Sequence, residues 1–245
     1  MVDIGPEERI DFILDTDLKI IQSKDVFSFS LDAVLLAKFV YVPIQKGGMM
    51  DLCTGNGVIP LILSKRTKGP IYGIEIQPRL YDMARRSVAL NHLEKRITLH
   101  CGDILDAVKT FGAGMFNVVT CNPPYFTREQ AHIKNPNPHY AIARHELHMT
   151  LEDAIRVSSQ LVRQKGKVAF VHRPERLAEI LTLMETYRIA PKRLQFVHPR
   201  SGEPANMLLI EGVKDGRKGL KVLNPIFVYN DHGDYTKELK QLTYG

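Results

Sequence analysis

The residues with the most specific chemistry are Asn122, Pro123, Pro124 and Tyr125, which form the end of the apolar run FNVVTCNPPY. The Asn122 side-chain oxygen and the Pro123 carbonyl are both hydrogen-bond acceptors, because proline keeps its C=O. On a loop stiffened by prolines, these acceptors can hold the two N–H groups of one planar amine, while the Tyr125 ring stacks on a flat base. Such an arrangement would suit an amine on a flat ring, although Asn-Pro and Pro-Pro also mark ordinary turns.

Small and acidic residues follow three earlier apolar runs. Gly55 and Gly57 come where a strand would turn into a helix, and glycines there let backbone amides approach a ligand. Glu75 comes 20 residues after Gly55, where a carboxylate can accept hydrogen bonds from ribose hydroxyls. Asp103 ends the next run and can reach an adenine edge. Asp51 could be a helix cap and the other two solvated carboxylates, but their joint spacing favours a nucleoside site.

Alternating strands and helices must position these side chains. We expect strands over 48–54, 71–76, 97–103, 116–124 and 166–172, and helices over 58–65, 78–91, 151–163 and 175–187. The runs 194–199 and 205–213 are interpreted as an antiparallel pair that closes the sheet. Near-continuous apolar strands that alternate with helices predict a mainly parallel sheet with helices on both faces.

We expect a single domain over 1–245, with a core over 46–212 and a C-terminal extension over 213–245. The first 45 residues are interpreted as an extension packed on the core, with a short strand over 17–23 and a helix over 31–39 that Ser30 or Asp32 caps. The segment from Phe126 to about Thr150 is long, polar and rich in proline and histidine, which is typical of a functional or disordered loop.

The composition is that of a globular protein, with 44% hydrophobic and 24% charged residues. The sequence contains no run of eighteen apolar residues, so we expect no membrane-spanning helix. The charged N-terminus lacks the apolar core of a signal peptide. Three cysteines, Cys53, Cys101 and Cys121, lie in or beside predicted strands without metal-ligand spacing. We expect reduced, buried thiols in a cytoplasmic protein, with no structural metal.

The formal net charge of +6 fits either a polyanionic partner or a surface with a mild lysine excess. Two regions concentrate the charge. The C-terminal region contains Lys192, Arg193, Arg200, Lys214, Arg217, Lys218 and Lys221. The polar segment contains Arg128, Lys134, Arg144 and the histidines His132, His139, His145 and His148. The spacing of these histidines, with prolines between them, fits no common metal site.

The order of these features resembles the class I S-adenosylmethionine methyltransferases. Their first motif, D/E-x-G-x-G-x-G, is matched from Asp51 to Gly57, except that Cys53 replaces the first glycine. A nicotinamide-binding turn would need a third glycine where this chain has Pro60. The resemblance implies a Rossmann-like, mainly parallel seven-stranded sheet with an antiparallel C-terminal hairpin, and S-adenosylmethionine as cofactor. It implies that the ends of the first three strands hold the methionine, ribose and adenine parts of the cofactor, and that neighbouring residues add further contacts. The implied cofactor residues are Asp51, Thr54, Gly55, Asn56, Gly57, Glu75, Ile76, Asp103, Ile104, Asn122, and Ser30 and Asp32 from a segment that closes over the cofactor.

The NPPY tetrapeptide has the pattern of amino methyltransferases that act on adenine, guanine, cytosine or glutamine nitrogens. With FSFSLDAVLLAKF, DLCTGNGVIPLILSKRT and the later ARHE, the chain is similar from about Ile20 to Ile210 to the bacterial tRNA1(Val) adenine-N6 methyltransferases. This resemblance implies methylation of the adenosine 3′ of the anticodon. We expect the protein to be a monomer or weak homodimer. Tyr125, Arg144, Lys192, Arg193 and Arg200 would contact the RNA, although Arg144 could equally be a surface loop residue. A release-factor-type glutamine methyltransferase and an RNA-binding module without turnover remain alternatives. Too few residues precede Gly48 for the N-terminal helical domain that the glutamine enzymes carry.

Overall fold

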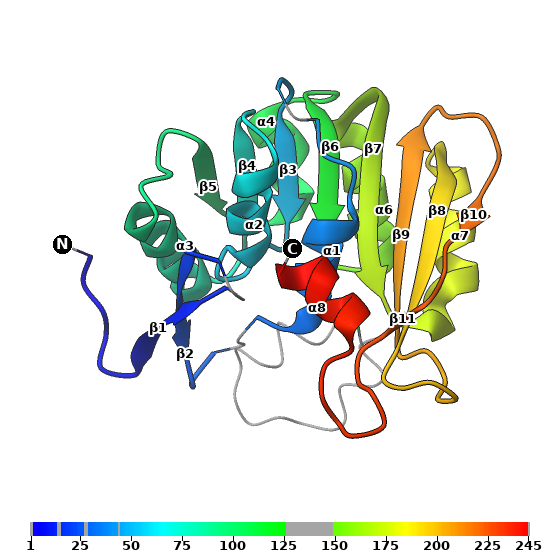
Figure 1. Cartoon of the computed structure of the whole chain (residues 1–245). Helices are drawn as coiled ribbons and strands as arrows, with labels where there is room; N and C mark the ends of the chain where they lie inside the picture. The colour runs from blue at the N-terminus through cyan, green and yellow to red at the C-terminus, as the bar shows by residue number, and fades with distance from the viewer. Residues whose placement is uncertain (1, 14–15, 27–28, 44, 126–148, 245) are drawn as a thin grey trace.

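A large, mostly parallel β-sheet is the centre of the protein in a computed structural model that describes residues 2–13, 16–26, 29–43, 45–125 and 149–244 (Figure 1). Its strand order is β10-β8-β9-β7-β6-β3-β4-β5, and β11 also pairs with β8. The strands are β3 (Met49–Leu52), β4 (Ile71–Glu75), β5 (Ile97–Cys101), β6 (Phe116–Cys121), β7 (Val162–His172), β8 (Ile189–His198), β9 (Met207–Lys214), β10 (Lys221–Val222) and β11 (Ile226–Phe227). The pairs from β5 to β7 are parallel and β9 is antiparallel to both β7 and β8. The predicted α/β class is therefore confirmed.

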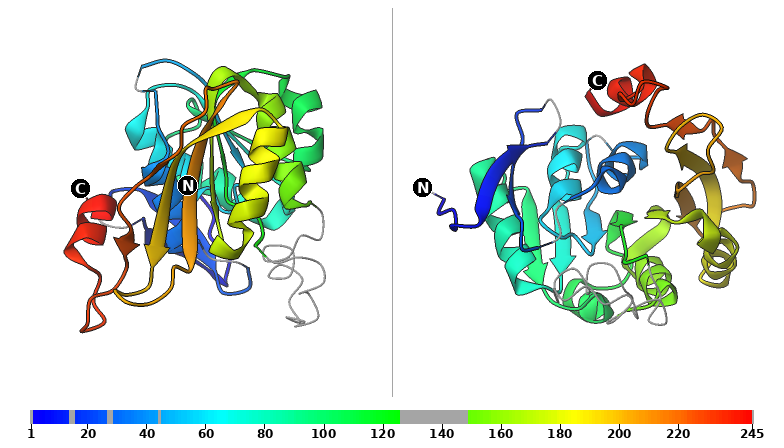
Figure 2. Two further views of the ribbon diagram at one scale, coloured as in Figure 1. Left: turned by 90° about the vertical axis from the view of Figure 1, so that its right-hand side faces the viewer. Right: turned by 90° about the horizontal axis from the view of Figure 1, so that it is seen from below.

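Helices cover both faces of this sheet (Figure 2). One apolar core lies between the sheet and α1 (Leu31–Phe39), α2 (Val58–Arg66) and Val88 of α3 (Pro78–Leu90). The other lies under α4 (Ala107–Phe111), α6 (Leu151–Leu161) and α7 (Leu177–Thr186). Local signals fix two helix starts, since Pro78 occupies the first turn of α3 and a capping box between Thr150 and Asp153 begins α6.

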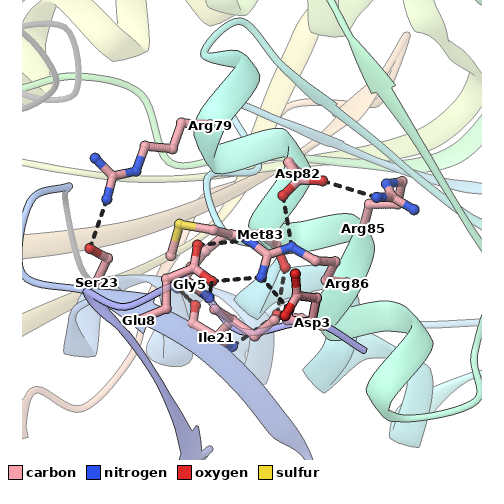
Figure 3. A network of polar contacts seen from close by, with 12 residues as sticks. Asp3, Gly5, Glu8, Ile21, Ser23, Arg79, Asp82, Met83, Arg85 and Arg86 are labelled. Atoms are coloured by element: carbon pink, nitrogen blue, oxygen red, sulfur yellow. Dashed lines mark hydrogen bonds and ion pairs between the residues drawn. The ribbon is translucent and has the colours of Figure 1, made fainter. Parts of the chain in front are cut away.

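The N-terminal residues form a hairpin of β1 (Glu8–Phe12) and β2 (Lys19–Ser23) that packs against α3. Arg86 of α3 is the centre of the polar contacts there (Figure 3): its guanidinium donates to Glu8 at 2.6 and 2.7 Å and to Asp82 at 2.7 Å. The predicted strand over 17–23 is confirmed. The sequence did not predict β1, because ERIDF is short and mostly charged.

The C-terminal residues first add two short strands to the sheet and then form a helix that packs beside α1. β10 and β11, of two residues each, lie parallel to β8 and extend the sheet beyond the seven longer strands that were expected. The last helix, α8 (Lys237–Tyr244), contacts α1 and β11 and buries Leu239 to 1% exposure. Within the described ranges, we find no helix with the length and apolar character of a membrane span.

The three cysteines are free thiols with different surroundings. Cys121 is buried in β6 and Cys53 is half-buried. Cys101 is exposed, so the expectation that all three thiols are buried is wrong for it. The reason is its position at the end of β5, which is an edge strand of the sheet among the described residues.

Candidate active site

A cavity of about 580 Å³ lies at the carboxyl ends of β3, β4 and β6 and takes in residues that follow β5. In Figure 1 these strand ends form the lower edge of the sheet. The carboxyl edge of a parallel sheet is where α/β proteins generally bind ligands, because the loops that follow adjacent strands meet there. Most predicted site residues line this one cavity: Ser30, Asp32, Thr54, Gly55, Asn56, Glu75, Ile76, Asp103, Ile104, Asn122, Pro123, Pro124 and Tyr125.

A tight turn after β3 forms one wall of the cavity. Gly55 and Gly57 have φ values of +56° and +91°, which glycine adopts at no steric cost. An added Cβ at Gly55 would meet no atom within 4 Å, so glycine is required there by conformation and leaves open space in front of the backbone. Cys53 also has a positive φ of +57°, which costs a residue with a Cβ about 1–2 kcal/mol. The turn thus survives the replacement of the first motif glycine with some strain.

Glu75 joins the end of β4 to this turn. Its carboxylate is 5% exposed and accepts from the backbone N–H of Gly55 at 2.8 Å and from that of Gln77 at 2.9 Å. Burial raises the pKa of Glu75, and the backbone donors partly oppose that shift. A carboxylate offers about four acceptor positions, so the backbone donors leave acceptor capacity for a hydroxyl group of a ligand in the cavity.

Asp51 lies beneath the turn instead of on the cavity wall. It is fully buried and accepts from the Thr54 hydroxyl at 2.6 Å and from the Thr120 hydroxyl at 2.7 Å. Burial raises its pKa to about 7. Gly57 also lies off the wall, where an added Cβ would come within 3.2 Å of Ala84. We therefore assign both residues a role in positioning the turn, with Thr54 as the residue that faces the cavity.

Asp103 and Ile104 follow β5 and line the cavity as expected. The Asp103 carboxylate accepts from the backbone N–H of Leu105 at 2.9 Å and so begins a short 3-10 helix, Ile104–Asp106. One Asp103 oxygen is thereby fixed, which orients the carboxylate at the end of the strand.

Asn122 and Tyr125 lie on the same cavity, together with Asp32 from the start of α1. The Tyr125 hydroxyl contacts both the Asp32 carboxylate and the Asn122 side-chain oxygen, the latter at 2.6 Å. A hydroxyl has one proton, so it donates to one of these two oxygens at a time. Burial, followed by the negative charge of Asp32, raises the pKa of Tyr125, and the hydroxyl therefore stays protonated.

Asp32 is held by its own helix start. It accepts from the Ser30 hydroxyl and from the backbone N–H of Ala33 at 2.7 Å. Ser30 occupies the N-cap position of α1 without a side-chain hydrogen bond to the helix backbone. Ser30 and Asp32 were both expected as caps of α1, and it is Asp32 that accepts from a backbone N–H at the helix start. The same carboxylate links α1 to Tyr125.

Sequence reasoning missed Arg173, which follows β7 and lines the same cavity. Its guanidinium carbon lies 5.4 Å from the centre of the Tyr125 ring, and Nη1 donates to the Asn206 carbonyl at 2.8 Å. His172, fully buried beside it, packs edge-on to Tyr125 with ring centres 5.2 Å apart. The available signal was position, because Arg173 directly follows a predicted parallel strand.

The basic residues predicted to contact RNA lie in different environments. Arg200 is exposed, whereas the Lys192 ammonium contacts the Arg217 carbonyl. Arg193 points inward: its guanidinium lies 4.3 Å from the Phe39 ring and 3.6 Å from the buried Glu211 carboxylate. Arg144 and the histidines from His132 to His148 lie outside the described residues. In the portion that is described, no group of histidine, cysteine and acidic side chains could hold a metal ion.

Comparison with known proteins supports the resemblance drawn from the motifs. The family model described as the methyltransferase small domain matches residues 17–191. A tRNA1(Val) (adenine(37)-N6)-methyltransferase of Porphyromonas gingivalis is 32% identical over 165 residues, which are 66% of this chain and 64% of that protein. The chain therefore matches a little under two thirds of that relative's length. A protein of the same description from Aeromonas hydrophila is 26% identical, with 86% of each chain covered.

Solved structures show the same fold. A predicted O-methyltransferase from Agrobacterium tumefaciens superposes with a TM-score of 0.70 at 24% identity, covering 87% of this chain and 96% of that one. Other methyltransferases with this fold were crystallised with S-adenosylmethionine or S-adenosyl-L-homocysteine.

Proposed function

This chain belongs to the methyltransferase small domain family, and we propose that it transfers a methyl group from S-adenosylmethionine to N6 of an adenine in tRNA. One observation carries the proposal: the residues suited to a nucleoside and those suited to an exocyclic amine line a single cavity. The relatives named above support tRNA1(Val) as the substrate and the adenosine 3′ of its anticodon as the target.

The residues around the turn fit the proposed cofactor. The space in front of Gly55, the remaining acceptor capacity of Glu75 and the Asp103 carboxylate suit an amino acid moiety, a ribose and an adenine edge respectively. Thr54 and Asn56 line the same wall, and Asp51 holds Thr54 in place. When bound, S-adenosylmethionine supplies an electrophilic methyl group on a positively charged sulfur.

Asn122 and Pro123 are proposed to prepare the amine for attack. An exocyclic amine lends its lone pair to the ring and is a poor nucleophile. Accepting both N–H groups, one at the Asn122 oxygen and one at the Pro123 carbonyl, favours a tetrahedral nitrogen whose lone pair is free. No strong general base is needed, since the proton becomes acidic once the nitrogen carries positive charge.

Tyr125 can change its hydrogen-bond acceptor from Asn122 to Asp32 when the amine binds. The Asn122 oxygen that the amine needs contacts the Tyr125 hydroxyl here at 2.6 Å. When the amine donates to Asn122, the tyrosine can donate to Asp32 alone, so its half-buried hydroxyl keeps a hydrogen-bond partner. The Tyr125 ring then stays in place as a surface for the base.

The enzyme's cations are suited to the RNA backbone. Arg173 lines the cavity next to Tyr125 and Arg200 is exposed near its mouth, so both can approach phosphates. Arg193 is half-buried and its guanidinium is engaged by Glu211 and the Phe39 ring, so it is not among the proposed RNA contacts. Lys192 would have to give up its contact with the Arg217 carbonyl in order to bind a phosphate.

The test compares wild type with Asn122→Ala on total bacterial tRNA, ribosomal RNA and release factors, using labelled methyl donor and mass spectrometry of the products. Wild type should label N6-methyladenosine in the anticodon loop of a valine tRNA. Asn122→Ala should lower turnover by about 100-fold or more, with cofactor affinity nearly unchanged because the Gly55, Glu75 and Asp103 wall remains. Asn224→Ala, at an exposed position, is the matched control. Label in a release-factor glutamine would replace RNA with protein as the substrate, and near-wild-type turnover by Asn122→Ala would refute its role.

A further inference from the structure

Two exposed tyrosines stack on each other at the mouth of the active-site cavity. The rings of Tyr229 and Tyr235 have centres 5.4 Å apart and planes 25° apart, and the residues are 36% and 37% exposed. Tyr229 lines the same cavity as Asn122 and Tyr125. Since Ile226, Val228 and Leu239 already bury the apolar surface of this segment, the exposed ring pair is not needed to anchor it.

The turn between the two tyrosines is held firmly. Tyr229 and Tyr235 form an isolated antiparallel bridge, and the Asn230 side chain accepts from the backbone N–H groups of His232 and Asp234, each at 3.0 Å. The N–H of Tyr229 donates to the Pro199 carbonyl at 2.8 Å, which fixes the turn to the connection after β8. In Figure 1 both this turn and the β8–β9 connection extend below the lower edge of the sheet. A prearranged surface of this kind loses little conformational freedom when it binds.

A cation lies beside the aromatic pair. The Arg200 guanidinium carbon is 5.7 Å from the centre of the Tyr229 ring, and its Nη1 lies 3.2 Å from Glu203 at the exposed surface. Aromatic faces next to arginine are the combination with which proteins bind single-stranded nucleic acid, because bases stack on the ring and the cation approaches phosphate. The second aromatic site of the cavity, Tyr125, has its own arginine, Arg173, at 5.4 Å.

We propose that Tyr229, backed by Tyr235, stacks on the base of a nucleotide that adjoins the target adenosine, with Arg200 near its phosphate. This inference rests on the proposed function, since it needs an RNA whose target base enters at Tyr125. A target base that leaves its stack exposes the face of its neighbour. Tyr229 covers that face and so favours the splayed conformation of the loop. Stacking of this kind tolerates any base, so the site selects unpaired RNA and not a particular neighbouring letter.

The experiment measures steady-state methylation of an anticodon stem-loop RNA and of the same RNA without the base 5′ or 3′ of the target. Tyr229→Leu should raise KM for the intact RNA by roughly 10-fold with a small change in kcat, and Tyr229→Phe should restore it. Removing the correct neighbouring base should weaken wild type by a similar factor and cause no further loss in Tyr229→Leu. Tyr41→Leu, another exposed tyrosine that does not line the cavity, is the control.

A second readout needs no turnover. With S-adenosyl-L-homocysteine present, 2-aminopurine at the adjoining position should lose fluorescence on binding to wild type and keep it with Tyr229→Leu. An equal KM defect of Tyr229→Leu on intact and base-free RNA, or no quenching at either neighbouring position, would overturn the stacking site while wild type still methylates the RNA. If wild type methylates no RNA, the proposed function fails first, and the two failures are distinct.

Discussion

Replacing Glu75 by glutamine tests the assignment of the cofactor site most directly. The carboxylate is 5% exposed, lines the cavity and is held in a fixed orientation by backbone donors that include Gly55 and Gln77. Glutamine has the same shape, keeps one oxygen and replaces the other by an NH₂ group. It therefore removes a charge and one acceptor without opening a hole beneath the turn, which Glu75→Ala would do.

The expected loss of affinity follows from the contacts. If the remaining acceptor capacity of Glu75 binds ribose hydroxyls, glutamine removes one charge-assisted hydrogen bond and weakens any other. A hydrogen bond to a charged group contributes about 1.5–3 kcal/mol, which corresponds to a Kd for S-adenosylmethionine that is roughly 10- to 150-fold higher. The orientation of the glutamine amide decides where in this range the loss of affinity falls. If its NH₂ group faces the Gly55 N–H, the two donors repel, the turn shifts and the loss approaches about 150-fold.

Isothermal titration calorimetry with S-adenosylmethionine gives the affinity, and urea unfolding of each variant shows whether the turn is intact. Glu94→Gln, at an exposed position after α3, is the matched control and should bind like wild type. The reasoning is refuted if Glu75→Gln is folded, unfolds at the wild-type urea concentration and binds the cofactor with unchanged affinity. Glu75 would then be a structural clamp on the turn and no ribose ligand.

Two further predictions concern pH and stability. Burial raises the pKa of Asp51 to about 7. The free energy of unfolding of wild type should therefore fall relative to that of Asp51→Asn as pH rises from about 4 to 7, by about 1.4 kcal/mol per pH unit at most. Urea unfolding that gives the two proteins parallel profiles of stability against pH would contradict this. The hydrogen bond from Arg86 lowers the pKa of Glu8, so Glu8→Gln should cost about 1–3 kcal/mol at neutral pH. That difference should fade as pH falls through the lowered pKa, and the exposed control Glu7→Gln should show neither effect in thermal unfolding at each pH.

Much of the sheet and the site could be predicted because both depend on local patterns. Buried parallel strands are continuous apolar runs, and polar residues that directly follow such strands must meet at one edge. Glu75, Asp103 and Asn122 satisfy this rule, and each lines the cavity. The strand β1 and the two-residue strands β10 and β11 carry no such pattern, since they form by pairing with strands that are already in place.

The side chains whose roles the sequence could not give are those that depend on distant partners. Arg193 looked like a surface cation, but Glu211 on the neighbouring strand β9 and the ring of Phe39 on α1 draw it inward. Tyr229 lies over a hundred residues beyond Asn122, in a segment without a recognisable motif, and reaches the cavity because β11 pairs with β8. Charge and spacing give no indication of such contacts, because they depend on the completed fold.

The contact of Tyr125 with both Asp32 and Asn122 links the start of α1 to the candidate active site. Residues 33 to 37 of α1 are all buried to 4% exposure or less, so the helix start cannot shift without disturbing the core. Asp32 is thereby fixed beside Tyr125 and holds a second acceptor ready for its hydroxyl. Without that acceptor, an amine that displaced Tyr125 from Asn122 would leave the half-buried Tyr125 hydroxyl without a protein partner, at a cost of at most about 1–3 kcal/mol. In the proposed reaction the position of Asp32 removes this cost from substrate binding, through a residue that lies 90 positions before Asn122 in the sequence.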